Sequence, residues 1–530
     1  MNRRTFLLGA LGLPLLLRGV GGQSASIARA APATPGSTRV TPHGKLTLAW
    51  HTGISSLWLD PQDQPAMLTP TNFLYALHDA LAKNYRDQYA VPALAERYDI
   101  AADFKSATFV LRQGLKFHNG APVTPEDVQF TYEHYRGGQA AVLKGKTERL
   151  EIVDDRTVRF HFKEPFLDFK ILYGTSASGA GWIVPAQYYQ QVGADAFKQQ
   201  PIGAGPYKLV RQEAGTRLEF EAFADYYRPV HAKQLVMVSV PEDATRIAML
   251  ERGEADIMYL VPGELVETVQ QMPGVKLAPT HGGPWWLEFP GFEDAKNPFH
   301  DKRVREAVSL TIDRQAINEA ETAGLSQILG NWIPDDWPGA IKWPPFEHDL
   351  AKAKRLLAEA GHANGFDVDW LTPLPPYFSL GERIVGQLQQ VGIRTRLQTM
   401  ERGTFFQRLQ GGREAFPGVQ IIANVSGTPG DWAGRYRAYF QCQGFASRTC
   451  VPELDAKFKQ YEESVHPEER TKLAEEIQRA ILENYYFVPV YRAAFICAIG
   501  PRVMAESWQE AFPTVQSVYA YPWEELKLKS

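Results

Sequence analysis

Cysteine and net charge are both scarce in this sequence of 530 residues. Its three cysteines, Cys442, Cys450 and Cys497, are too few for a fold held together by disulfides. The 56 Lys and Arg residues are nearly balanced by 60 Asp and Glu residues, which leaves a net charge of −4. Nucleic-acid binding depends on a basic surface, so the composition predicts no nucleic-acid partner.

Motifs for metal binding and catalysis are also lacking. The 12 histidines are scattered and form no compact ligand set, so we expect no metal ion and no other cofactor. Gly203-Ala204-Gly205 precedes a strand pattern, whereas a dinucleotide-binding loop precedes a helix. Ser176 misses the Gly-x-Ser-x-Gly nucleophile motif by one position. The sequence therefore predicts no catalytic residue and favours a protein that is not an enzyme.

Long hydrophobic runs are absent after the first 30 residues, where no uncharged apolar run reaches 18, so we expect a soluble mature protein. The apolar stretch 6–17 is shorter than a bilayer span and suits a signal-peptide core. Arg3 and Arg4 before it resemble a twin-arginine export signal; the alternative is an ordinary secretory signal with incidental arginines. An Ala-x-Ala pattern predicts cleavage between Ala30 and Ala31, followed by a flexible leader over 31–44.

The rest of the chain has a globular composition, with 44% hydrophobic and 12% aromatic residues. Strand and helix patterns alternate from residue 45 onward, which predicts an α/β fold with several layers. Capping signals predict helices that begin at Thr124-Pro125, after Asp349 and at Ser379. The predicted strands are Lys45–Trp50, Ala107–Arg112, Thr157–Phe162, Arg217–Glu221 and Leu235–Val240.

Aromatic residues gather in segments rich in Gly and Pro, which we interpret as connections between elements. Such side chains are suited to lining a concave ligand site. The alternative is that most of them are packed loop anchors. They are Trp285, Trp286, Trp332, Trp337, Trp343, Tyr377 and Trp432.

Several segments together carry a resemblance to a known family. The main ones are Val91-Pro-Ala-Leu-Ala-Glu-Arg-Tyr-Asp-Ile100, Ala107-Thr-Phe-Val-Leu-Arg-Gln-Gly-Leu-Lys-Phe-His-Asn-Gly120 and Val123-Thr-Pro-Glu-Asp-Val128. Further matches are Leu59-Asp60-Pro61, Pro201–Tyr207, Arg246–Ile257, Pro298–Arg305, Ile312–Arg314 and Ala353–Gly361. This set spans roughly residues 45–500 and resembles the family 5 solute-binding proteins, the peptide- and nickel-type receptors of ABC importers.

The resemblance implies a two-lobed periplasmic-binding-protein fold of class II, in its large three-unit type, with the ligand cleft between the lobes. One lobe would comprise 45–288, with an inserted unit at about 76–199, and would be completed by 495–530. The other lobe would comprise 289–494. The chain would cross between the lobes near 286–290 and near 493–497.

The resemblance also suggests ligand-binding positions. Peptide-binding relatives hold the peptide amino group with an aspartate that lies shortly before a cysteine. Counting back from Cys442 without gaps, that position is Thr428, while Asp431 and Trp432 follow it. Dipeptide-type relatives hold the carboxylate with the arginine of an Arg-Pro-Tyr run, and the matching run here begins with Pro375. Because both charged anchors are replaced, we expect a small, uncharged or singly charged solute rather than a free dipeptide.

Two further aromatic positions complete the predicted site. Tyr377 is retained from the Arg-Pro-Tyr run, and Trp286 lies at the expected crossing between lobes. We therefore expect Tyr377, Thr428, Asp431, Trp432 and Trp286 to be the ligand-binding candidates. If the ungapped count is wrong, Asp431 is the alternative amine anchor.

The cysteines fit the same interpretation. Cys442 and Cys450 recur as a pair in dipeptide-type relatives. Because an exported protein resides in an oxidising compartment, we expect a disulfide between them. Cys497 lies in an apolar run and is expected to be a buried free thiol. The function implied is a monomeric periplasmic receptor that delivers a peptide-like or organic solute to an ABC importer permease. The alternatives are an exported hydrolase with an aromatic cleft and a periplasmic chaperone or sensor on the same scaffold.

Overall fold

The structure is a computed structural model that describes residues 28–29, 40–64, 68–86, 88–176, 178–425, 431–444, 446–512 and 521–529. The predicted signal-peptide core, the cleavage position between Ala30 and Ala31, and the candidate Thr428 lie outside these residues. Within the described part of the chain, none of the helices has the length and apolar character needed to cross a membrane.

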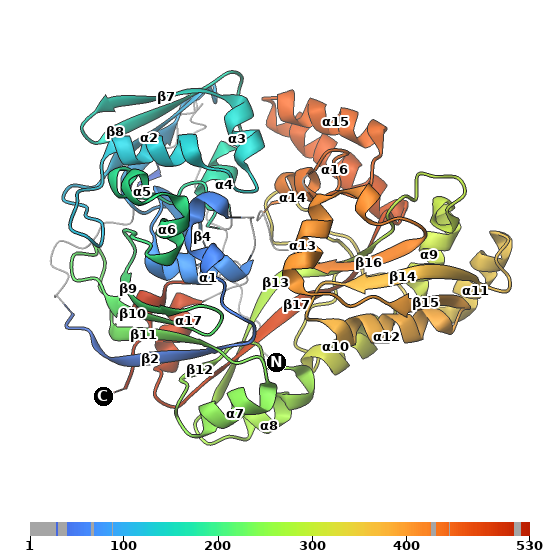
Figure 1. Ribbon diagram of the computed structural model, residues 1–530. Helices are drawn as coiled ribbons and strands as arrows, with labels where there is room; N and C mark the ends of the chain where they lie inside the picture. The colour runs from blue at the N-terminus through green and yellow to red at the C-terminus, as the bar shows by residue number, and fades with distance from the viewer. Residues whose placement is uncertain are drawn as a thin grey trace, which may run out of the picture.

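A ten-stranded mixed sheet runs through the whole molecule (Figure 1). Its strand order is β15-β14-β16-β13-β17-β12-β2-β11-β10-β9. At its centre, β13 (Lys276–Glu288) and β17 (Phe487–Ile499) form a long antiparallel pair that links the two halves. β13 pairs with β16 on one side, and β17 pairs with β12 on the other. The sheet therefore belongs to two lobes that share these two central strands.

The first lobe contains one outer half of this sheet and packs a core that includes Trp50, Phe73 and Trp523. In it β2 runs parallel to both β11 and β12. Its strands are β2 (His43–Trp50), β9 (Tyr207–Glu213), β10 (Arg217–Ala222), β11 (Ala232–Ser239) and β12 (Ile257–Met258). Its helices are α1 (Leu68–Leu77), α7 (Asp243–Glu251), α8 (Val266–Gln270) and α17 (Ala505–Ala511).

A separate unit with its own sheet is attached to the first lobe, at the upper left of Figure 1. Its five strands, in the order β1-β5-β6-β8-β7, enclose an aromatic core with the helices beside them. The strands are β1 (Ala28–Arg29), β5 (Ala95–Ile100), β6 (Ser106–Leu111), β7 (Thr147–Asp154) and β8 (Thr157–Phe162), beside the pair β3 (Ala82–Tyr85) and β4 (Gln88–Pro92). The helices are α2 (Pro125–His134), α3 (Ala140–Lys146), α4 (Phe169–Gly174), α5 (Ala186–Val192) and α6 (Ala194–Gln199).

The second lobe contains the other outer half of the large sheet, in which β14 is parallel to both β15 and β16. Its strands are β14 (Phe366–Pro373), β15 (Ile393–Leu397) and β16 (Gln420–Val425). Its helices are α9 (Lys302–Thr311), α10 (Arg314–Thr322), α11 (Leu350–Glu359), α12 (Phe378–Gln389), α13 (Arg402–Gln410), α14 (Trp432–Tyr439), α15 (Pro452–Glu463) and α16 (Pro467–Glu483).

Local signals in the sequence predict several of these elements, and two of the predictions need correction. Trp285, Trp286 and Trp432 do not lie in connections, because the first two are part of strand β13 and Trp432 is the first residue of helix α14. The capping signal at Ser379 is also wrong. Helix α12 has Tyr377 at its N-cap, and the Ser379 hydroxyl donates a hydrogen bond to Glu321 at 2.8 Å instead. A contact between α12 and the neighbouring helix α10 of the same lobe thus replaces the local one that the sequence pattern suggests.

Candidate functional site

The carboxyl ends of parallel strands in the two lobes meet at the centre of the molecule. His51 directly follows β2 and Tyr259 directly follows β12, while Tyr377 follows β14 and Arg402 follows β15. In open α/β sheets, ligands bind beyond the carboxyl ends of the strands. We call these four residues, together with Thr69 of α1, the interlobe seam.

Arg402 joins the two sides of the seam. Its Nη1 donates a hydrogen bond to the Pro375 carbonyl at 2.5 Å, and its Nη2 lies 3.5 Å from the Thr69 hydroxyl of the first lobe. The Tyr377 hydroxyl also interacts with the guanidinium group. The Arg402 Nε is buried and has no hydrogen-bond partner among the described residues.

Burial controls the protonation of the groups around Arg402. Burial lowers the pKa of His51 well below its usual value, and the positive charges of Arg402 and Arg246 lower it further. His51 is therefore neutral at pH 7. Burial also raises the pKa of Tyr377 and lowers that of Arg402. The seam consequently contains one formal positive charge surrounded by neutral hydrogen-bonding and aromatic groups.

A second contact between the lobes lies at their outer edge, and we call it the interlobe rim. Asp168, which precedes α4 in the inserted unit, accepts hydrogen bonds from Arg437 at 3.0 Å and from Arg470 at 2.9 Å. Arg437 also donates to Glu462 at 2.8 Å. The buried Asp431 caps α14 by accepting a hydrogen bond from the Gly434 N–H at 3.1 Å. The rim is therefore an ion-pair network in which each charge has an opposite partner nearby.

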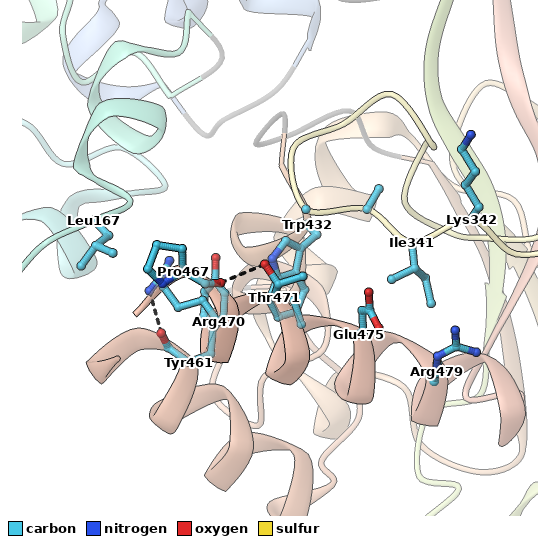
Figure 2. Close-up of a pocket in the computed structure, with 13 residues that line it drawn as sticks. Leu167, Ile341, Lys342, Trp432, Tyr461, Pro467, Arg470, Thr471, Glu475 and Arg479 are labelled. Carbon is cyan, nitrogen blue, oxygen red and sulfur yellow. Dashed lines mark hydrogen bonds between the residues drawn. The ribbon is translucent and has the colours of Figure 1, made fainter. Parts of the chain in front are cut away.

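A cavity of about 600 Å³ opens beside the rim. Figure 2 shows Leu167 of the inserted unit on one side and Trp432, Tyr461 and Arg470 of the second lobe on the other. Arg470 donates a hydrogen bond to the Tyr461 carbonyl at 2.6 Å, which fixes its side chain along the cavity wall. Groups from both lobes line this cavity, so its shape depends on the relative position of the lobes.

The predicted ligand-binding residues fall into three environments. Tyr377 belongs to the seam, where its ring packs edge-on against Trp285 at 5.2 Å. Asp431 and Trp432 belong to the rim, and Trp432 packs against Tyr461 at 4.7 Å between ring centroids. Trp286 is fully buried in the core of the second lobe. The structure thus brings together Asp431 and Trp432 but separates both from Tyr377.

The interactions of Asp431 explain an unusual pKa. Burial raises the pKa of this carboxyl to about 7, and the negative charge of Asp168 contributes to the increase. Arg437 and Arg470 act in the opposite direction but do not cancel the effect of burial. Asp431 is therefore a group whose charge changes close to neutral pH.

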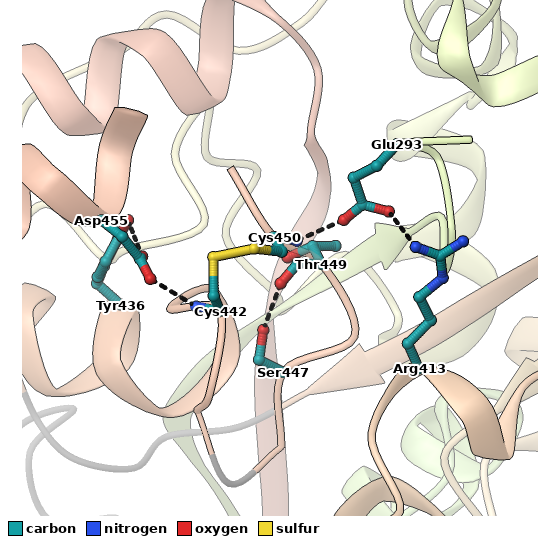
Figure 3. Close-up of a disulfide and its surroundings, with 8 residues drawn as sticks. All are labelled: Glu293, Arg413, Tyr436, Cys442, Ser447, Thr449, Cys450 and Asp455. Carbon is teal, nitrogen blue, oxygen red and sulfur yellow. Dashed lines mark hydrogen bonds and ion pairs between the residues drawn. A yellow bond between two sulfur atoms is a disulfide. The ribbon is translucent and has the colours of Figure 1, made fainter. Parts of the chain in front are cut away.

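Cys442 and Cys450 form a disulfide with an S–S distance of 2.14 Å, and Cys497 is a buried free cysteine. Figure 3 shows how this disulfide lies beside α14 and α15. The Cys442 N–H donates to Asp455 at 2.9 Å, and the Tyr436 hydroxyl donates to the same carboxylate at 2.9 Å. The bridge and these hydrogen bonds hold the end of α14, which carries Arg437, in place.

Sequence reasoning missed Arg402, which is the charged centre of the seam. The available signal was its position in the chain: Arg402 lies a few residues after strand β15 (Ile393–Leu397) and is the first residue of helix α13. That position puts a side chain at the carboxyl edge of a parallel sheet. Its contact with Thr69, 333 residues away in the chain, leaves no local trace in the sequence.

The fold and the seam define a class: two-lobed α/β binding proteins with polar groups where the lobes meet. Residues 90–434 match the family model described as bacterial extracellular solute-binding proteins, family 5. The chain belongs to this family.

Similar proteins agree with that assignment. Di/tripeptide-binding protein 1 of Pseudomonas aeruginosa (strain UCBPP-PA14) is 26% identical over 438 residues, which cover 76% of this chain and 80% of the relative. Heme-binding protein A of Haemophilus influenzae is 26% identical over 452 residues, which cover 78% and 80%. The crystal structure of NikA from Brucella suis in complex with Fe(III)-EDTA has a TM-score of 0.79 at 21% identity and covers 92% of this chain and all of that one (100%). These relatives are binding proteins rather than enzymes.

Proposed function

We propose that this protein is an extracytoplasmic receptor that binds a small peptide-like or organic solute between its lobes and delivers it to an ABC importer permease. The observation that carries this proposal is the interlobe seam. Polar and aromatic groups from the carboxyl ends of strands in both lobes converge there, at the place where α/β proteins bind ligands.

Binding by such a receptor requires the lobes to move relative to each other. We propose that β13 and β17 form the hinge, because they are the strands that link the two halves of the large sheet. The pairing of β13 with β17 shifts register near Pro284, and such irregularities give a strand pair a local bend. On this basis the lobes comprise 45–288 with 495–530, and 289–494.

The predicted contacts to the solute extend over both interlobe regions. We place Tyr377 in direct contact at the seam, with Thr428 and Asp431 in the segment that follows β16. Trp432 is the candidate that lines the rim cavity. Trp286 contributes by supporting the second lobe, since its indole is fully buried.

Export and assembly complete the proposal. The protein is exported to the periplasm by the twin-arginine route, is cleaved between Ala30 and Ala31, and acts as a monomer. N-terminal sequencing of the periplasmic protein and the loss of export after Arg3 and Arg4 are changed to Lys test the first two points. Size-exclusion chromatography with light scattering tests the third.

The central experiment measures binding, closure and transport together. The mature protein is mixed with a low-molecular-weight extract of the producing cells, and native mass spectrometry detects the bound mass. We expect a single bound solute, a decrease in the radius of gyration by small-angle scattering, and loss of its uptake when the gene is deleted. Conversion of the solute into a product by substoichiometric protein would contradict the proposal and identify an enzyme.

A further inference from the structure

Most of the buried arginines that the structure describes have a carboxylate or several backbone carbonyls as partners. Four of them pair with carboxylates: Arg448 with Glu288, Arg437 with Asp168, Arg492 with Asp336 and Arg246 with Asp243. Arg305 and Arg314 donate to several backbone carbonyls, and the Arg435 guanidinium lies over the rings of Trp286, Trp332 and Trp337. Arg314, for example, donates to the carbonyls of Pro489, Ser309 and Ile312 and to the Ser309 hydroxyl.

Arg402 has neither arrangement. In the part of the chain that the structure describes, it forms no ion pair. Its polar contacts are with the Pro375 carbonyl, with the Tyr377 hydroxyl and, at the limiting distance of 3.5 Å, with Thr69. The neighbouring Glu401 is engaged as the N-cap of α13, where it accepts a hydrogen bond from the Thr404 N–H at 2.9 Å. Arg402 is half-buried and its Nε is fully buried, and a cation removed from water without an ion pair is costly, so its retention needs a reason.

The geometry of the guanidinium group indicates which edge is available. Nη1 is held by the Pro375 carbonyl, whereas Nε has no hydrogen-bond partner among the described residues and the Thr69 hydroxyl lies at the limiting distance of 3.5 Å from Nη2. The Nε and Nη2 donors are parallel and match the two oxygens of a carboxylate. The Pro375 carbonyl thus orients the guanidinium and leaves its bidentate edge toward the first lobe.

We infer that the solute carries one carboxylate group, which Arg402 binds through Nε and Nη2 while Tyr377 and His51 contact the atoms beside it. This inference rests on the proposed receptor function. A carboxylate fits better than a phosphate or sulfate dianion because the seam has a single cation that lacks a carboxylate partner. The nearby Arg246 is already paired with Asp243. The position differs from Pro375, where dipeptide-type relatives carry their arginine.

The experiment uses the full mature protein and the small-molecule extract in three forms: untreated, treated with phosphatase, and treated with carbodiimide and methylamine to convert carboxylates to amides. We expect the wild type to bind the same mass from the first two forms and nothing from the third. Equal binding from the amidated extract would overturn the inference and leave the receptor function intact. Loss after phosphatase would show that the anion is a phosphate and would overturn it too.

Variants test the role of Arg402 itself. Arg402→Gln should increase the half-saturating concentration of untreated extract by about 30-fold or more, the range of a hydrogen bond to a charged group. Arg402→Lys should restore part of the binding, because it keeps the charge but loses the bidentate edge. Arg394→Gln is the matched control. It removes the same charge from an exposed pair with Asp367 in the same lobe and should bind like the wild type.

A second readout separates binding from folding. Removal of a half-buried cation that has no ion pair relieves a desolvation cost, so solute-free Arg402→Gln should melt at the same temperature as the wild type or higher. A lower melting temperature with unchanged binding would show that Arg402 is structural and would overturn the inference. If no form of the extract yields a bound mass on the wild type, the receptor proposal fails and this inference fails with it.

Discussion

The rim and the seam are both contacts between lobes, yet the charged groups of the rim have partners of opposite charge and the cation of the seam does not. At the rim, Asp168 is shared by Arg437 and Arg470, and Glu462 provides a further negative charge. At the seam, Arg402 forms no ion pair with any described residue, and its hydrogen-bonding neighbours Pro375, Thr69 and Tyr377 are uncharged. An ion-pair network holds two surfaces together by itself, whereas a cation without an ion pair gains its partner from outside the protein.

The rim and the seam therefore contribute to binding in different ways. The rim supplies attraction between the lobes that does not depend on the solute, and the seam supplies the attraction that does. A receptor must release its solute to a permease, so an interface satisfied throughout would hold the lobes together with or without cargo. The contrast gives four predictions, in decreasing order of expected effect.

The largest effect is expected from Asp168→Asn at the rim. The change leaves Arg437 and Arg470 without the carboxylate that links them to the inserted unit, and breaking a buried ion pair from one side typically costs about 3–5 kcal/mol. Urea denaturation should show an unfolding free energy lower by about 3 kcal/mol. Asp225→Asn is the control, because its pair with Lys116 is exposed. If both variants lowered the unfolding free energy equally, the ion pairs of the rim would contribute no more to stability than an exposed pair, which would contradict the prediction.

Removal of the disulfide should have the next largest effect. Replacing Cys442 and Cys450 together with Ser should lower the unfolding free energy by about 2–3 kcal/mol, as expected for a short loop. Because the bridge lies beside α14, which carries Arg437, hydrogen exchange should increase at the rim and remain unchanged at the seam. Increased exchange around Arg402 would show that the two regions are not independent. Cys497→Ser, which removes a thiol without breaking a bridge, is the control.

The third prediction concerns pH. The pKa of Asp431 is raised to about 7 in the folded protein, above its value in the unfolded chain. The folded state therefore holds this proton between about pH 4 and 7, the unfolded state does not, and stability from this group falls as pH rises through that range. Asp431→Asn should abolish this decrease in the unfolding free energy, which is on the order of 2 kcal/mol. The Asn side chain still caps the helix.

Denaturation of both forms at pH 4.5 and pH 8 measures this difference. The variant should be more stable relative to the wild type at pH 8 than at pH 4.5. A constant difference between the two proteins at both pH values would contradict the prediction.

The smallest effect is expected at the seam from Tyr377→Phe. The change removes the hydroxyl that interacts with Arg402 but keeps the ring that packs against Trp285. Solute affinity should weaken by about 1 kcal/mol, the net value of one hydrogen bond, while the melting temperature stays within about a degree. Tyr188→Phe, which removes an exposed hydroxyl, should leave the affinity as it was. A fall in melting temperature with constant affinity would place Tyr377 among packing residues.

Sequence patterns predicted elements whose signals are local. The strand predicted over Thr157–Phe162 is β8 with the same bounds, and Asp349 caps α11 by accepting a hydrogen bond from the Lys352 N–H at 2.8 Å. The two central strands were not predicted. β13 contains Pro279, Gly282, Gly283 and Pro284, which are typical of turns, and its pairing with β17 overrides them.

The candidate site was predictable only in part, for a related reason. Tyr377 and Asp431 could be named because a family pattern marks their positions. Arg402 could not, because what distinguishes it is the absence of an opposite charge among residues brought together from distant parts of the chain. Burial and pairing of a charge are properties of the assembled fold, and no pattern of neighbouring residues encodes them.

The place of β17 in the chain determines how the protein can be made. This central strand begins at Phe487, so during synthesis every other strand of the large sheet emerges before it. Until then β12 and β13 have unpaired edges, which are prone to pairing with other chains. We expect a chain that ends before Phe487 to aggregate rather than to yield one folded lobe. The nascent protein therefore needs protection along most of its length, and both lobes are completed by the same late event.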